Sequence, residues 1–316
     1  MVANSKANPS VFPKNEEGIA RFNRVKPWTN AAISALFIAL ALITLIPAVF
    51  VLILSLSSEA SVNAIGYSFL PNEWSFTTYT YLWRERMYIG QSFINSLLVT
   101  LCGTGLGLML CSTMGYALSR PNYKFRKFLS YFIFIPMLFS GGLVSSYMIN
   151  TQIFMLKNTY WALILPIACS TFYIIIMRTF FQTTVPDSII ESAKMDGARQ
   201  FRIYTQIILP ISLPAIATIG LFFTFNYWND WFLARLYIDT NRQDLYPLQY
   251  LLISIERNIE FFTRNVQYMT PDTRNTVPGE TIRMAIVMVV VLPIACSYPF
   301  FQRYFITGLT IGAVKG

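Results

Sequence analysis

Histidine is absent from this sequence of 316 residues, and charged side chains are scarce. Without histidine, the chain lacks the commonest general base and the commonest metal ligand of proteins. Only 12% of the residues are charged and 54% are hydrophobic, whereas an average soluble domain carries about 25% charged residues. So few charges cannot cover a globule of this size with polar surface, and the composition therefore favours a membrane protein.

Two further absences narrow the function classes. Cys102, Cys111, Cys169 and Cys296 all lie in apolar segments, where a free cysteine behaves as a small hydrophobic side chain. The chain has no CxxC pair and no disulfide framework, so we expect no metal site. It also has no GxxxxGK[ST] phosphate loop, so we do not expect this chain to bind ATP itself.

Long apolar segments predict an all-α, polytopic membrane protein with six spanning helices. A bilayer core about 30 Å thick requires about 20 apolar residues in a helix. The first segment is longer than the apolar region of a signal peptide and lacks a clear cleavage site, so we expect it to remain as a helix. The six expected spans cover residues 29–55, 91–118, 127–148, 160–181, 211–232 and 282–299.

Glycines punctuate two of these spans. Gly103, Gly105 and Gly107 in the second span offer GxxxG-type contacts to a neighbouring helix. A dinucleotide-binding function for this glycine run is excluded, because no strand precedes it and it lies at membrane depth. In the third span, the FSGG sequence at 139–142 introduces a flexible point.

Lysine and arginine predict the orientation of the chain. They are concentrated in the tail at 1–28, in the loops after the second and fourth spans, and at the C-terminal end. The positive-inside rule therefore places both termini in the cytoplasm. The long loops at 57–90 and 233–281 then lie outside, and residues 246–262 in the second loop have helical apolar spacing. The net charge of +9 is therefore explained by the orientation of the chain in the membrane, and it does not indicate that the chain binds nucleic acid.

A polar stretch at 186–210, between the fourth and fifth spans, contrasts with the apolar chain around it. Pro186 and Asp187 are typical of a helix start, and Gly197 is typical of a helix end. A second helix is expected from about Ala198 to the prolines that precede the fifth span. Such a helix, turn and helix can dock into a groove of a partner protein, or it can be an ordinary amphipathic connector.

This stretch resembles the EAA loop of ABC importer permeases, whose pattern is roughly E-A-A-x-x-D-G-A, followed after a spacer by I-x-L-P. The chain departs from the pattern at Ser192, which is also small, and at Ile208, which directly precedes Leu209. Residues 94–120, 228–238 and 297–316 resemble further parts of the same family. The matching positions of the loop are Glu191, Ser192, Ala193, Asp196, Gly197 and Ala198.

The resemblance extends to the smaller, six-span permease of carbohydrate importers of the maltose-transporter type, and within it to oligosaccharide importers. It implies that residues 29–316 form a transmembrane domain and half of a pore, with a second permease as the other half. Two ATPase subunits would carry ATP and Mg²⁺ and dock on the EAA loops, and an extracytoplasmic binding protein would deliver the sugar. The segment 308–316 would reach toward the ATPases or be a plain solvated end. No catalytic residue is expected in this chain.

The end of the fifth span holds a polar and aromatic cluster. Polar groups within the membrane usually face a bundle interior or water, and amides, carboxylates and aromatic rings bind sugars. The cluster therefore predicts a substrate path, although an interfacial aromatic belt has the same composition. The resemblance does not decide this point, because the larger partner permease supplies the main sugar contacts in maltose-type systems. The cluster comprises Asn226, Tyr227, Trp228, Asn229, Asp230 and Trp231.

Two other function classes fit the sequence less well. A self-sufficient secondary transporter of a small polar solute needs an ion site near the midplane and often has inverted repeats. Outside the cluster at the end of the fifth span, we find no midplane Asp, Glu or Lys and no repeat. A membrane-embedded enzyme is disfavoured by the lack of histidine and of paired intramembrane carboxylates. The membrane lipid, the partner subunits and an oligosaccharide are therefore the expected contacts.

Overall fold

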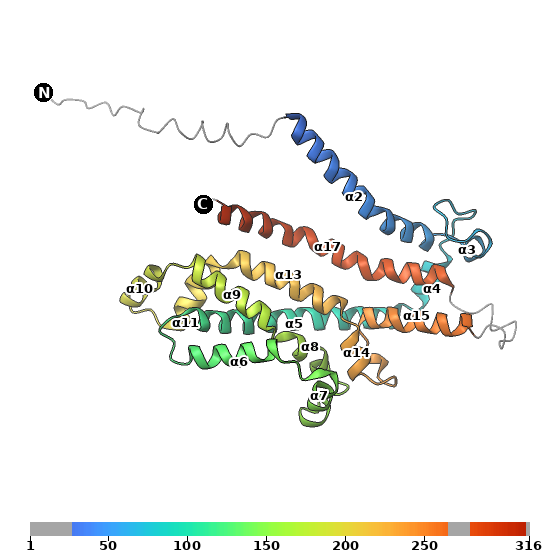
Figure 1. The fold of residues 1–316 in the computed structure, drawn as a ribbon. Helices are drawn as coiled ribbons and strands as arrows, with labels where there is room; N and C mark the ends of the chain where they lie inside the picture. The colour runs from blue at the N-terminus through green and yellow to red at the C-terminus, as the bar shows by residue number, and fades with distance from the viewer. Residues whose placement is uncertain (1–26, 265–278, 314–316) are drawn as a thin grey trace. The chain divides into compact units, whose positions relative to one another are not determined.

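The computed structural model describes residues 27–264 and 279–313, and these residues form helices and their connections (Figure 1). A bridge between Ser57 and Trp74 is the strand-like pairing in the described part of the chain. The expected all-α class is therefore confirmed. Two compact units can be distinguished, residues 1–51 and residues 52–316, and each is described by itself.

The first described helix, α2 (Pro27–Ser55), is apolar on all sides. It has 29 residues and is long and apolar enough to cross a membrane. Its large side chains are mostly exposed, for example Leu36, Phe37 and Ile43. A helix that is hydrophobic all round is typical of a membrane span. The helix agrees with the expected first span at 29–55.

The centre of the second unit is α5 (Arg86–Ser119), which corresponds to the second expected span. Helices α9 (Thr171–Thr184) and α13 (Leu213–Asn229) lie along it (Figure 1). The ring of Tyr227 covers Gly103, and the ring of Phe223 covers Gly107, so that a Cβ atom at either glycine would clash with the ring. Gly105 faces open space. The expected GxxxG-type contact is confirmed for Gly103 and Gly107.

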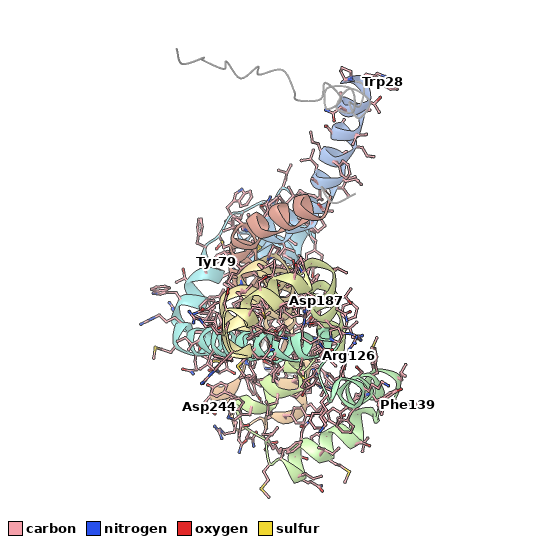
Figure 2. The ribbon with its side chains drawn as sticks, turned by 90° about the vertical axis from the view of Figure 1, so that its left-hand side faces the viewer. Trp28, Tyr79, Arg126, Phe139, Asp187 and Asp244 are labelled. Carbon is pink, nitrogen blue, oxygen red and sulfur yellow. The ribbon has the colours of Figure 1, made fainter. Side chains whose placement is uncertain are left out.

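The third expected span, at 127–148, is not one continuous helix. Helix α6 (Arg126–Leu138) ends before Phe139, and α7 (Gly142–Met148) and the π-helix η1 (Ile149–Ile153) follow. Gly142 has a φ of 80°, a backbone conformation that favours glycine over residues with a Cβ atom. Figure 2 labels Phe139 at this break. The flexible point that the FSGG sequence predicts is a full interruption of the helix.

The fourth and fifth expected spans are bent. Helix α8 (Tyr160–Ala168) and α9 meet at 46°, so the fourth span is a broken pair. Before α13, the helical segment Gln200–Ile211 meets it at 80°, and the break lies at Ser212. Helix α13 itself ends at Asn229, before the expected end of the fifth span at residue 232.

The count of six spans stays a prediction. Three described helices are long and apolar enough to cross a membrane alone, and five spans result when each bent pair is counted as one. The last helix, α17 (Glu280–Ala313), extends well beyond the expected span at 282–299 and includes most of the C-terminal segment 308–316. Residues 1–26 and 314–316, which include most of the N-terminal tail, lie outside the described residues.

One end of the second unit is built from three helices and the start of α17. These are α3 (Glu59–Ile65), α4 (Thr77–Arg84) and α15 (Leu248–Arg264) (Figure 1). The helix expected at 246–262 is α15. The carboxylate of Glu59 accepts hydrogen bonds from the backbone N–H groups of Glu280 and Thr281 at 3.0 and 3.2 Å. It thus caps the positive N-terminus of α17, where a negative charge is stabilising.

Candidate functional site

Helix α10 (Asp187–Met195) carries the first half of the polar stretch and lies at the end of the unit opposite α15 (Figure 1). Ile190 and Ala193 are buried, whereas most of the other side chains are exposed. This division gives α10 one face that packs on the bundle and one polar face that is open. The carboxylate of Asp187 stands in the first turn, where the helix dipole favours a negative charge.

The turn after α10 is a Schellman motif. The N–H of Ala198 donates to the carbonyl of Ala193, and the N–H of Gly197 donates to that of Lys194, both at 2.9 Å. Gly197 has a φ of 76°, the left-handed conformation that this motif requires. A Cβ atom at Gly197 would meet no neighbour, so the glycine is needed for its backbone conformation rather than for close packing within this chain.

The structure places the six expected coupling residues together on α10 and its turn. Glu191, Ser192, Asp196 and Gly197 are exposed, Ala198 is half-buried and Ala193 packs inward. Their role in coupling stays a prediction.

Two residues around the turn that the sequence reasoning did not select are large and apolar. Met195 is 88% exposed and Phe201 is 76% exposed. The sequence signal was available, since both residues fall off the buried face of a polar amphipathic stretch. Exposed apolar side chains beside a polar helix face are typical of a contact with another protein.

Arg120, at the end of α5, holds the start of α10. Its Nη1 donates to Asp187 Oδ1 at 2.7 Å, and its Nη2 donates to the carbonyl of Phe181 at 3.2 Å. The guanidinium also lies 5.4 Å from the ring centroid of Tyr116. Arg120 therefore joins α5, α9 and α10. Figure 2 looks at the second unit from this end and labels Asp187.

The segment after the turn is joined to α5 by side-chain contacts. It consists of α11 (Gln200–Ile203), the π-helix η2 (Tyr204–Ile208) and α12 (Leu209–Ile211). Ile203 and Ile208 are fully buried, and the hydroxyls of Tyr204 and Ser112 are hydrogen-bonded at 2.7 Å. The arrangement connects the exposed turn mechanically to the centre of the bundle, because this segment continues directly into α13.

The expected substrate-path cluster is divided by the structure. Tyr227 and Trp228 are buried, and their polar atoms donate to the carbonyls of Ile164 at 2.8 Å and Val290 at 3.1 Å. These two side chains therefore hold α13 against α8 and α17 and do not line an open surface of this chain. Neither contact could be expected from the sequence, because each links segments more than sixty residues apart.

The other four members of the cluster lie closer to the surface. Asn226 and Asn229 are exposed, and Asp230 and Trp231 are half-buried. Asn226 donates to the hydroxyl of Tyr173 at 3.1 Å, and Asp230 accepts from the backbone N–H of Leu233 at 3.2 Å. Asp230 thereby begins α14 (Phe232–Tyr237). The assignment of these residues to a substrate path stays a prediction.

A buried asparagine organises the end of the bundle that carries α15. Asn95 on α5 is 1% exposed. It donates to the carbonyls of Asp244 at 2.7 Å and Tyr246 at 3.1 Å, and it accepts from the hydroxyl of Tyr160 at 2.8 Å. The loop around η3 (Gln243–Leu245) is thereby tied to α5 and α8. A buried amide with every partner in place fixes one arrangement of these segments.

The connection between η1 and α8 is fastened to the turn after α14. Asn158 has a φ of 59° and exchanges two hydrogen bonds with Asp239, both at 2.8 Å. Lys157 lies 2.8 Å from the other oxygen of the same carboxylate. The hydrogen bonds from Lys157 and Asn158 lower the pKa of Asp239 below its ordinary value.

No group of His, Cys, Asp and Glu that could hold a metal ion is found among the described residues.

Comparison with known proteins identifies relatives over nearly the whole chain. The family model of the binding-protein-dependent transport system inner membrane component matches residues 103–311. The polygalacturonan/rhamnogalacturonan transport system permease protein YtcP of Bacillus subtilis is 36% identical over 278 residues, which cover 87% of this chain and 94% of that protein. Protein LplC of the same organism is 35% identical, and the match covers 87% of this chain and 90% of that protein.

A more distant relative and a solved structure belong to the same kind of transport system. The arabinooligosaccharides transport system permease protein AraQ of Bacillus subtilis is 27% identical over 90% of this chain and 95% of that protein. A chain in the crystal structure of a bacterial ABC transporter involved in the import of the acidic polysaccharide alginate superimposes with a TM-score of 0.73. It is 26% identical, and the match covers 94% of this chain and all of that chain.

Proposed function

Because this chain belongs to the family of binding-protein-dependent transport system inner membrane components, we propose that it is one permease subunit of an ATP-driven oligosaccharide importer. It forms half of the translocation pore, and a second permease forms the other half. The sugar class is supported by the names of the relatives, which transport polygalacturonan and rhamnogalacturonan or arabinooligosaccharides. The alginate importer supports the same class.

The exposed turn of α10 is the coupling site in this proposal. The observation that carries it is an open polar helix face, flanked by the exposed Met195 and Phe201, on a helix whose other face, with Ile190 and Ala193, is buried in the bundle. A groove of a partner ATPase receives this face. Glu191 and Asp196 offer carboxylates to basic groups of the partner, and Ala193 with Gly197 fixes the helix and its end.

The proposed orientation places α10 and both termini in the cytoplasm, as the distribution of lysine and arginine favours. The end of the bundle with α3 and α15 then faces outward, toward the binding protein that delivers the sugar. Two ATPase subunits dock from the cytoplasm and hold ATP and Mg²⁺, so that this chain performs no chemistry. ATP binding and hydrolysis move the docked helices, and the bundle alternates between outward and inward opening.

The test uses the complete complex, purified from native membranes with its co-purifying subunits and reconstituted in liposomes. Gly197→Asp is expected to abolish ATP-driven uptake of the cognate oligosaccharide and to weaken retention of the ATPase, while membrane insertion is unchanged. Gly66→Asp is the control at the other end of the unit, because Gly66 also has a positive φ, 75°, with a ψ of −162°, and a Cβ atom there meets no neighbour. Normal uptake by Gly197→Asp would exclude the coupling role.

The same preparation separates this function from a secondary transporter. Uptake that stops without ATP supports the importer. Uptake that continues without ATP and without the co-purified subunits would exclude it, and α10 would then be an ordinary connector.

A further inference from the structure

A basic cleft lies beside the substrate-path cluster, at the end of the unit that carries α15. It has a volume of about 670 Å³ and is open to solvent. Arg235 of α14 and Arg257 of α15 line it, together with Thr240 and Asn241 of the turn that follows α14. Sites for small molecules usually measure about 300–1,000 Å³, so the volume of this shallow, widely open cleft lies within that range.

The charge of this cleft is positive. Its one carboxylate, Asp239, is already paired with Lys157 at 2.8 Å and hydrogen-bonded by Asn158, and these bonds lower its pKa. Among the residues that the structure describes, neither Arg235 nor Arg257 forms an ion pair. Two guanidinium groups therefore face the cleft without an anion to neutralise them.

The position of the cleft connects it to the expected sugar path. The backbone N–H of Arg235 donates to the carbonyl of Trp231 at 3.1 Å, so Arg235 stands one helical turn after the cluster 226–231. A sugar that leaves the binding protein and moves along this cluster would pass Arg235 at its outer end.

We propose that this cleft binds the carboxylate groups of an acidic oligosaccharide, one that contains uronic acid units, as it enters the pore. The proposal rests on the proposed import function and specifies its substrate class. A guanidinium matches a carboxylate with two parallel N–H donors, and two guanidiniums from different helices can hold two acidic units of one saccharide. Thr240 and Asn241 supply a hydroxyl and an amide for the sugar hydroxyls. Relatives that transport polygalacturonan and alginate are consistent with this class.

The experiment measures ATP-driven uptake by the reconstituted complex with a galacturonate trimer and with its methyl ester, which removes the charges from the same sugar. Arg235→Gln and Arg257→Gln are each expected to lower kcat/KM for the trimer about 10-fold, the size of one lost charge-assisted hydrogen bond. Uptake of the methyl ester is expected to be unchanged. Arg235→Lys keeps the charge but loses the paired N–H donors of the guanidinium, so its kcat/KM for the trimer should lie between those of the wild type and Arg235→Gln.

Arg242→Gln is the matched control, because its guanidinium is already paired with Asp244 at 2.9 and 3.0 Å; its uptake of the trimer should equal that of the wild type. Equal uptake of the trimer by all variants would overturn the proposal. An equal loss for the trimer and the ester, together with weaker binding of the delivery protein, would assign the cleft to an acidic protein surface instead. Wild-type uptake of neutral sugars alone would overturn only the acidic class, whereas no ATP-driven uptake of any saccharide would overturn the importer itself.

Discussion

Arg120 and Asp187 form an ion pair of 2.7 Å between the end of α5 and the first turn of α10. The two side chains differ in their surroundings, since Arg120 is 15% exposed and Asp187 is 67% exposed. The pair is therefore a partly exposed contact whose basic member is embedded in the bundle. Its position makes it the direct link between the centre of the bundle and the proposed coupling helix.

We expect Arg120→Met to be much more harmful than Asp187→Asn. Loss of Asp187's charge removes a surface ion pair worth at most about 1 kcal/mol. Loss of the guanidinium also removes the bonds to Phe181 and Ser119, and we expect a decrease of about 2–3 kcal/mol in the free energy of unfolding. Thermal unfolding of the detergent-solubilised complex measures both. Equal losses would show that the pair itself, and not the anchoring of Arg120, sets the stability.

Glycines of α5 provide a second prediction. Gly103→Leu and Gly107→Leu would force side chains into the rings of Tyr227 and Phe223, and overpacking of this kind usually costs about 1–3 kcal/mol. Gly105→Leu is the control, because a Cβ atom there meets nothing within 4 Å. We expect lower thermal stability and lower yield of assembled complex for the first two variants only. A similar loss for Gly105→Leu would indicate a partner helix on that face.

The third prediction concerns the buried amide of Asn95. Asn95→Leu keeps the volume but leaves the carbonyls of Asp244 and Tyr246 without their donor, and each orphaned buried group costs about 1–3 kcal/mol. Tyr160→Phe removes a single bond to the same amide and should cost about 1 kcal/mol. Hydrogen exchange of residues 243–248 should rise in Asn95→Leu and change little in Tyr160→Phe. Unchanged exchange in both variants would show that the loop is held by other contacts.

The fourth prediction concerns the exposed Met195 and the binding of the ATPase. Met195→Ser should weaken the association of the ATPase about 10-fold, the effect expected when an apolar anchor is lost from an interface. Met87→Ser is the matched control, because Met87 is 82% exposed and lies at the start of α5, away from α10. Dissociation of the ATPase from the detergent-solubilised complex is the readout. Identical dissociation for both variants would place Met195 outside the interface.

Local signals in the sequence predicted the helices and the turn of the polar stretch. Pro186, Asp187 and Gly197 mark the limits of α10 through backbone chemistry that acts within a few residues. The apolar segments likewise indicated α2, α5 and α17, since a helix needs about 20 apolar residues to cross the hydrocarbon core.

Contacts between distant segments were not predictable in this way. Tyr227 and Trp228 look like a sugar-binding pair in the sequence, yet their polar atoms are satisfied by carbonyls of α8 and α17. The sharp bend at Ser212 was equally hidden, because Pro210 and Pro214 mark a helix re-entry but not its angle. The periodicity of a sequence indicates which residues are apolar. Tertiary packing then determines which polar side chains remain free to bind a ligand.

The bend of 80° at Ser212 gives the proposed coupling segment the shape of a crank. Its short arm of 12 residues is roughly 18 Å long and its long arm, α13, is roughly 26 Å long, at 1.5 Å per residue. In the proposed importer, a displacement of the short arm is therefore passed directly to α13 and to the helices that α13 packs against. The hydrogen bond between the hydroxyls of Tyr204 and Ser112 joins this short arm to α5. The far end of the long arm carries Asn226 and Asn229, so α13 directly connects the proposed ATPase contact with the residues beside which the sugar is expected to pass.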